Sequence, residues 1–172
     1  MTDSPAPATG LAAHLAALAT DLTTATQQGD QPAPVTLAHT CRGFLLAGAV
    51  SGLLDHYALP RRDTFAVCAE ACERAVALLY KVLGEQLIRR YAHSGEQAVL
   101  LRHGRDELLD SIPEDVDRIA AAMITLAAAL HSALAPLLEQ ESLPPTIRGA
   151  ARMAADAATI VHSHCGGDSG GW

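Results

Sequence analysis

Two cysteines four residues apart are the side chains in this sequence with the clearest chemical potential. Cys68 and Cys72 fall on the apolar stripe of a long helical pattern, so both are expected to point into the core. On a helix their Cβ atoms stand roughly 5 to 6 Å apart, which is too far for a disulfide and suits two sulfur ligands of one ion. Soft sulfur ligands favour Cu(I) or Zn(II). The pair therefore predicts a copper or zinc site, and the alternative is that both cysteines are small buried core residues.

The five residues from Cys68 to Cys72, Cys-Ala-Glu-Ala-Cys, are similar to a unit that the cysteine-rich copper-storage helical bundles repeat many times. The likeness implies Cu(I) as a bound ion. Because the unit occurs once in this sequence, it does not assign the chain to that family.

A second group of potential metal ligands closes the last predicted helix. His162, His164 and Cys165 follow one another within four residues. Adjacent residues on a helix point about 100° apart, so His164 and Cys165 could share an ion only if the helix had already frayed there. The alternative is a polar helix end, where a histidine cation also suits the helix dipole.

A third set of side chains could act on a small molecule. His131 is the one ionisable group between residues 119 and 138, and Arg152, Asp156 and His162 follow one side of the last helix. In a pocket between the last two helices, a neutral His131 could accept a proton and Arg152 could hold a carboxylate or phosphate. Asp156 would orient Arg152, and His162 would close the far end. The alternative is a hydrogen-bonded structural histidine beside a surface ion pair.

The elements that must position these side chains are all helical. Apolar residues recur at helical spacing, and alternating strand patterns are missing from the sequence. We predict an all-α, up-and-down bundle of four long helices with shorter ones packed alongside, forming a single domain over residues 9–165. Residues 1–8 are expected to be disordered and residues 166–172 to be a flexible glycine-rich tail. The predicted helices cover 11–28, 35–58, 61–93, a short segment after the capping box that begins at Ser94, a long segment after the one at Ser111, and a last one from about 143 to 164.

Three glycines interrupt the apolar run of the second predicted helix. Gly43, Gly48 and Gly52 each cost about 1 kcal/mol relative to alanine in a helix interior, so close backbone packing should compensate them. A hairpin to the next helix places Cys68 and Cys72 at about the level of Gly48 and Gly52. The cysteines are thus expected to face the thinnest part of the bundle.

Composition excludes some classes of function. The chain has 172 residues, a formal net charge of −7 and no basic stripe, so it would repel the phosphates of nucleic acid. Lys81 is the sole lysine among the 12 basic residues, which indicates GC-rich codons and a bacterial source. The first residues lack the features of a secretory signal, so a cytoplasmic protein with reduced thiols is expected. Residues 119–138 are long and apolar enough to span a membrane, but flanking acidic residues favour a buried central helix.

These observations predict a small bacterial helical bundle that binds a transition metal or a small ligand in its core. Ala- and Gly-rich faces also favour a homodimer. Two other functions stay open. One is a small enzyme or accessory protein of secondary metabolism that acts on an anionic or amino-acid-like substrate, and the other is a structural or regulatory interaction module.

Overall fold

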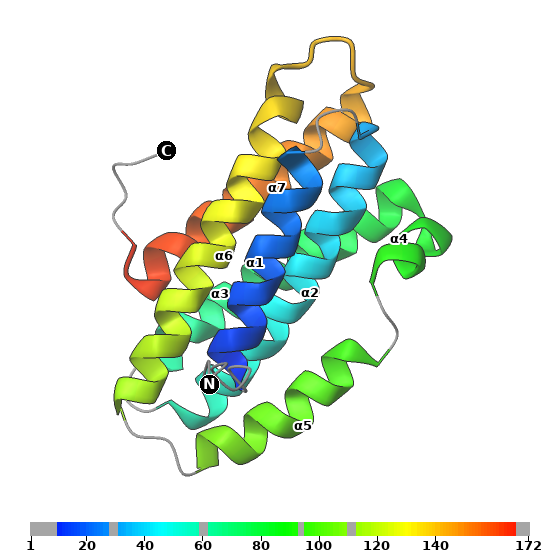
Figure 1. Ribbon diagram of the computed structural model, residues 1–172. Coiled ribbons are helices and arrows are strands. Elements are labelled where there is room, and N and C mark those ends of the chain that lie inside the picture. The colour runs from blue at the N-terminus through cyan, green and yellow to red at the C-terminus, as the bar shows by residue number, and fades with distance from the viewer. Residues whose placement is uncertain (1–9, 28–30, 59–61, 93–94, 110–112, 168–172) are drawn as a thin grey trace, which may run out of the picture.

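The computed structural model describes residues 10–27, 31–58, 62–92, 95–109 and 113–167. Within these ranges every regular element is an α-helix, which confirms the predicted all-α bundle (Figure 1). The expected disorder of residues 1–8 and most of the expected tail lie outside the described residues. The helices are α1 (Leu11–Gln27), α2 (Ala33–Tyr57), α3 (Arg62–Leu83), α4 (Glu85–Tyr91), α5 (Glu96–Leu109), α6 (Pro113–Glu139) and α7 (Pro145–Cys165).

Helix α2 is the centre of the bundle and contacts every other helix. It is apolar around most of its circumference, and its buried residues include Leu37, Phe44, Val50 and Leu54. A helix that is apolar all round must be covered on all sides. Helix α3 packs against α2 and α7, while α6 packs against α1, α2 and α7. The contact between α3 and α7 brings together segments about ninety residues apart in the sequence, and the metal-ligand candidates lie on these two helices.

Helix α6 differs from the buried central helix that we expected over residues 119–138. One face, which includes Met123, Leu126 and Leu130, is buried, whereas Thr125 and Ser132 are exposed on the other. Small alanines surround these polar residues, so the outer face exposes little apolar surface. By length and composition alone both α2 and α6 could cross a membrane, but core helices of soluble proteins pass the same test, and 72% of the apolar window in α2 is buried inside the bundle.

The helix predicted over residues 61–93 is interrupted at Gly84. This residue has a φ of 80°, a backbone conformation that side chains with a Cβ rarely adopt, and it separates α3 from α4. After the break, α4 turns back toward α2, where its Ile88 is fully buried and its Tyr91 ring packs on His39 with centroids 4.6 Å apart. The interruption was missed because residues on both sides of Gly84 have good helical spacing.

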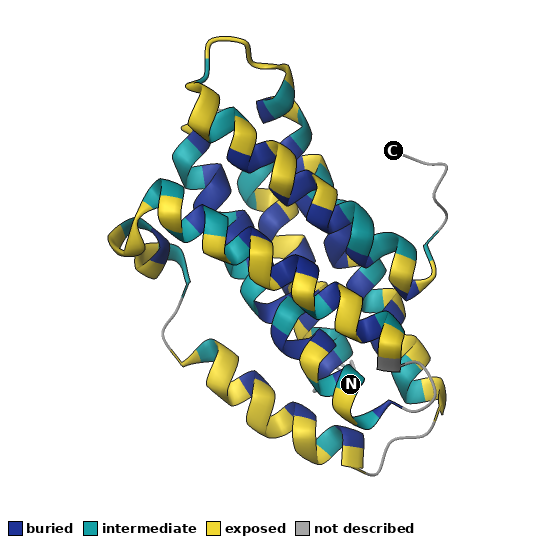
Figure 2. Cartoon of the chain, turned by 180° about the vertical axis from the view of Figure 1, so that it is seen from behind, coloured by how far each residue is buried: buried dark blue, intermediate teal, exposed yellow. Residues whose placement is uncertain are grey.

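Helix α5 lies on the outside of the bundle and is exposed over most of its surface (Figure 2). Two polar contacts fasten its ends. Near its start, Glu96 accepts hydrogen bonds from Arg42 Nε and Nη2 at 2.9 and 2.7 Å. Near its end, Glu107 Oε2 accepts a hydrogen bond of 2.8 Å from the backbone N–H of Leu11, the first residue of α1. A carboxylate at this position satisfies one of the otherwise unpaired N–H groups of the first turn of α1 and suits its positive dipole end.

Replacing Glu107 should therefore destabilise the protein, although the residue is only partly buried. We expect Glu107→Gln to lower the free energy of unfolding by about 1 kcal/mol, as the loss of a helix N-cap does. Urea denaturation of the two proteins measures this difference. The exposed neighbour Asp106→Asn is the matched control; an equal effect of both substitutions would show that net charge, and not the cap on α1, is responsible.

Candidate functional site

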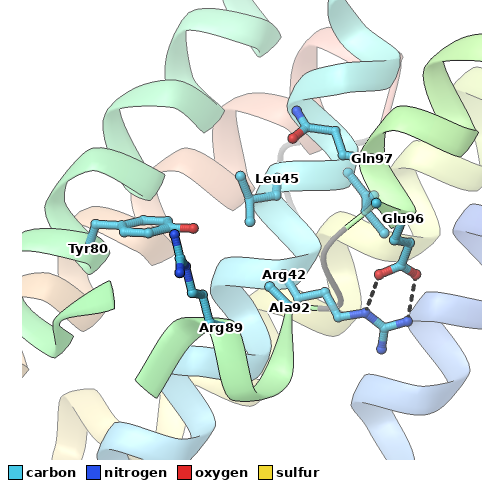
Figure 3. A pocket seen from close by; sticks show the side chains of 9 residues that line it. Arg42, Leu45, Tyr80, Arg89, Ala92, Glu96 and Gln97 are labelled. Carbon is cyan, nitrogen blue, oxygen red and sulfur yellow. Dashed lines mark hydrogen bonds and ion pairs between the residues drawn. The ribbon is translucent and has the colours of Figure 1, made fainter. Parts of the chain in front are cut away.

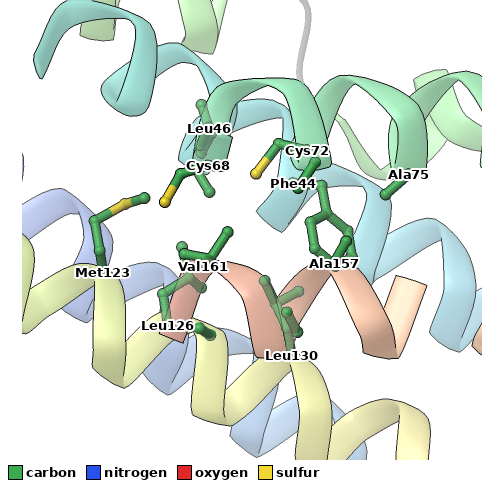
Figure 4. Close-up of a cluster of buried hydrophobic side chains, with 14 of the residues drawn as sticks. Phe44, Leu46, Cys68, Cys72, Ala75, Met123, Leu126, Leu130, Ala157 and Val161 are labelled. Atoms are coloured by element: carbon green, nitrogen blue, oxygen red, sulfur yellow. The ribbon is translucent and has the colours of Figure 1, made fainter. Parts of the chain in front are cut away.

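Cys68 and Cys72 lie on the buried face of α3, and neither has any exposed surface. Neither cysteine is in a disulfide. Figure 4 shows both sulfur atoms pointing into the same part of the core. The helical period of α3 is sufficient to account for this placement, since the stripe that holds Phe65 and Leu79 is buried with them.

A third thiol reaches this place from another helix. Cys165, the last residue of α7, is buried, and its side chain forms a hydrogen bond with that of Cys68. Cys165 was predicted to belong to a separate group of potential ligands at the end of the last helix. The packing of α3 on α7 joins the two groups into one cluster, which we call the thiol cluster and define as Cys68, Cys72 and Cys165.

Apolar side chains surround the thiol cluster. Leu46 comes from α2, Leu126 from α6 and Val161 from α7, and all three are buried. From α6 the thioether side chain of Met123, also fully buried, extends toward Cys68 (Figure 4). Thioethers and thiolates are both soft ligands. The cluster and Met123 thus gather four sulfur atoms from buried side chains.

This environment keeps the thiols protonated. The hydrogen bond with Cys165, followed by burial and by the charges that Cys165 and Cys72 would carry, holds the pKa of Cys68 far above its usual range. Burial, with smaller effects from Cys165 and Glu73, raises the pKa of Cys72 to about 12. At neutral pH both are therefore neutral thiols of low reactivity.

Gly48 gives the cluster its close contact with α2. A Cβ atom at this position would stand 3.1 Å from the Cβ of Cys72, so the glycine allows α2 and α3 to approach closely there. This confirms the predicted level of Cys72 beside Gly48. Gly52 has no such neighbour, because a Cβ there would meet nothing within 4 Å.

Ser51 lies on α2 one turn from Gly48. Its side chain is fully buried, and its hydroxyl has no hydrogen-bond partner among the described residues. A buried hydroxyl is normally paired, and an orphaned one marks a place where a water or ion is missing or where strain is stored.

The thiols are not arranged as a finished coordination site. In the part of the chain that the structure describes, no group of three or more His, Cys, Asp or Glu side chains is placed to hold a metal ion. A cysteine side chain rotates about a single torsion, χ1. One of the three cysteines would have to change its χ1 rotamer before all three sulfur atoms could contact the same metal ion.

The two histidines near Cys165 do not join the thiol cluster. Helix α7 stays regular through Cys165 and then ends at Gly166 in the left-handed conformation, with Gly167 N–H donating to His162 O at 2.9 Å. His164 is exposed, and its Nδ1 lies 3.0 Å from the carbonyl oxygen of Ile160. Because the helix does not fray, His164 and Cys165 point in different directions.

The predicted small-molecule residues divide into two groups. His131 on α6 lies near Asp156 and His162 on α7, since both influence its pKa. Arg152 lies instead with Arg148, Glu139 and Glu141 in an open depression at the α6–α7 turn. Asp156 and Arg152 are exposed, and His131 is half-buried.

The environment of His131 should make stability depend on pH. Burial lowers the pKa of His131 below its ordinary value of 6.5, Asp156 opposes this shift and His162 adds to it. The folded protein then binds fewer protons than the unfolded chain, so stability is full above pH 6.5 and declines as the pH falls toward the folded-state pKa.

We expect His131→Gln to make this decline shallower in urea denaturation between about pH 7 and about pH 5.5. The same change at the exposed His103 should leave the slope as it is; equal slopes in all three proteins would contradict the assignment.

Comparison with known proteins gives no family for this chain. No protein-family model matches it, and it has no significant similarity to a curated protein or to a solved structure.

Proposed function

We propose that this protein binds one Cu(I) ion in its core through Cys68 and Cys72, with Cys165 and Met123 as further sulfur ligands. The observation that carries the proposal is the convergence of three buried thiols from α3 and α7, with Cys68 hydrogen-bonded to Cys165. Free cysteines are often buried singly as small apolar residues. Three together with an adjacent thioether are harder to account for as core filler.

The ligand set favours copper over zinc. Structural zinc takes four ligands in a tetrahedron, nearly always thiolate, imidazole or carboxylate. Around the thiol cluster the described residues offer three thiols and a thioether, and His164 points elsewhere. Cu(I) accepts two or three soft sulfur ligands, including thioethers. Two thiols suffice for it, so a preformed group of three is not required.

The high pKa of the thiols is compatible with Cu(I). Burial disfavours a net charge in the core, which is why the thiols are protonated. When Cu⁺ binds to both Cys68 and Cys72 as thiolates, two protons leave for solvent, and the site keeps one negative charge in place of the two that the bare thiolates would carry. Affinity should then fall about a hundredfold for each unit by which the pH is lowered.

An anaerobic competition titration tests the proposal. The reduced full-length protein is added to Cu(I) held by a coloured chelator such as bicinchoninate, at several pH values. The expected result is the withdrawal of one equivalent of copper, more tightly at higher pH. Chelator colour that stays constant at every protein ratio would reject copper binding.

A further inference from the structure

A second potential binding site lies beside the thiol cluster, with which it shares Cys72, in a cleft bounded by α2, α3, α4 and the first turn of α5. The cleft consists of two neighbouring cavities of about 200 and 280 Å³. Leu45 and Gln97 line both, so the cavities adjoin one another. Together they fall within the range of roughly 300 to 1,000 Å³ that is typical of small-ligand pockets.

One end of the cleft is cationic and polar (Figure 3). Arg42, Tyr80, Arg89 and Glu96 line it. Both carboxylate oxygens of Glu96 accept hydrogen bonds from Arg42, so this pair is occupied in fastening α5 to the bundle. Arg89 is different, because its ion pair with Glu85 is solvent-exposed, with 72% of the Arg89 side chain accessible.

Arg89 can be recruited by a ligand at little cost. An exposed i,i+4 ion pair contributes only a few tenths of a kcal/mol, so its guanidinium can exchange Glu85 for another carboxylate. Beside it, the Tyr80 side chain extends into the same end of the cleft (Figure 3). Burial, the largest influence, raises the pKa of Tyr80, so its hydroxyl stays protonated and can donate a hydrogen bond.

The other end of the cleft is largely apolar. Phe44, Gly48, Cys72 and Val76 line it, together with Glu73 at the exposed rim. Gly48 has no side chain to fill this end, and a Cβ there would already press on Cys72. The walls at both ends come from helices fixed by buried residues, among them Ile88 of α4.

We propose that this cleft binds a small amphipathic carboxylate, with its head group held by Arg89 and Tyr80 and its apolar chain lying over Gly48 and Val76. The charges at the two ends of the cleft determine the orientation of the bound ligand. An anionic head at the Gly48 end would be repelled by Glu73, whereas Arg89 attracts it at the other end. Cys72 belongs to the thiol cluster and also lines the cleft, but the residues that would hold the carboxylate, Arg89, Tyr80 and Val76, are not copper ligands. The probes are tested on metal-free protein, so either proposal can fail without the other.

The test is a titration of the metal-free full-length protein with three small probes. Binding of each probe is measured by nuclear magnetic resonance, from the chemical shifts of the backbone amides. Octanoate carries both head and chain, 1-octanol only the chain, and acetate only the head. Octanoate should shift amides of α2, α3 and α4 around the cleft at concentrations at which acetate and octanol do not. Equal binding of octanol, or no binding of octanoate, would overturn the proposal.

Arg89→Gln provides the matched variant. The side chain is exposed, so the fold should not depend on it, and the affinity for octanoate should fall about tenfold because a charge-assisted contact is lost. Arg74→Gln is the control: Arg74 forms an equivalent exposed i,i+4 pair with Glu70 at 2.9 Å, on the same helix as Tyr80 but outside the cleft. Equal losses in the two variants would mean that octanoate responds to overall charge, and the assignment of the head group to Arg89 would be wrong.

Discussion

Replacing Cys68 and Cys72 together by alanine is expected to abolish Cu(I) uptake by the folded protein. The two residues supply the first two ligands of the proposed site, so affinity should fall by at least about a hundredfold. Alanine is preferable to serine here because a hydroxyl buried among apolar side chains would itself destabilise the fold. The chelator competition described above measures the loss directly.

Thermal denaturation gives an independent measure of the same effect. When free Cu(I) is buffered at about a thousand times its dissociation constant, binding to the folded state alone adds about 4 kcal/mol to the free energy of unfolding. The wild-type protein should show this gain and the double variant should not. Cys41→Ala is the control, because Cys41 is equally buried but lies on α2 outside the thiol cluster. Copper-induced stabilisation that persists in the double variant, or disappears in Cys41→Ala, would contradict the assignment of the ligands.

The second large effect is a loss of stability in alkali, for which Cys41 is the clearest source. Burial raises the pKa of Cys41 from its ordinary value of 9.0 to about 12. Above pH 9 the thiol of the unfolded chain ionises while that of the folded protein does not, so its contribution to stability is full below pH 9 and is lost as the pH rises toward 12. Between about pH 9 and about pH 11 the loss should be about 2 kcal/mol for this one group.

Urea denaturation of the metal-free protein across this range, with and without Cys41→Ala, measures that contribution. Cys72 and Cys68 act in the same direction, but they are present in both proteins, so the difference between the two pH profiles isolates Cys41. The variant should start less stable at pH 8 and lose stability less steeply above pH 9. Parallel profiles would show that the Cys41 thiol ionises as easily in the folded protein as in the unfolded chain.

The burial of Cys68 and Cys72 could be predicted from the sequence because it depends only on the helical period of one segment. The register of Cys72 against Gly48 could be predicted as well, because a short hairpin connects the two helices and fixes which of their residues lie opposite one another. Cys165 could not be placed in the same way. Its meeting with Cys68 depends on which distant helices touch, and no local pattern specifies the packing of α3 on α7.

Two other features were beyond local reasoning for related physical reasons. The break at Gly84 accompanies the burial of Ile88 and the packing of α4 on α2, and these are tertiary contacts that helical spacing in the sequence does not indicate. The pairing of Arg42 with Glu96 joins residues 54 positions apart, so neither residue appeared among the predicted site residues. The packing of the first turn of α5 on the middle of α2, which helps to create the cleft, was therefore not foreseen.

The central claim, a core copper site made of sulfur alone, is tested most directly by X-ray absorption at the copper edge of the one-to-one Cu(I) complex. The absorption edge identifies the oxidation state, and the fine structure distinguishes sulfur from nitrogen or oxygen neighbours. We predict Cu(I) with two or three sulfur atoms and no lighter ligand in its first shell. Nitrogen or oxygen among the atoms bonded to copper would contradict the proposed function. So would a protein that takes up no copper, because the one-to-one complex could then not be prepared.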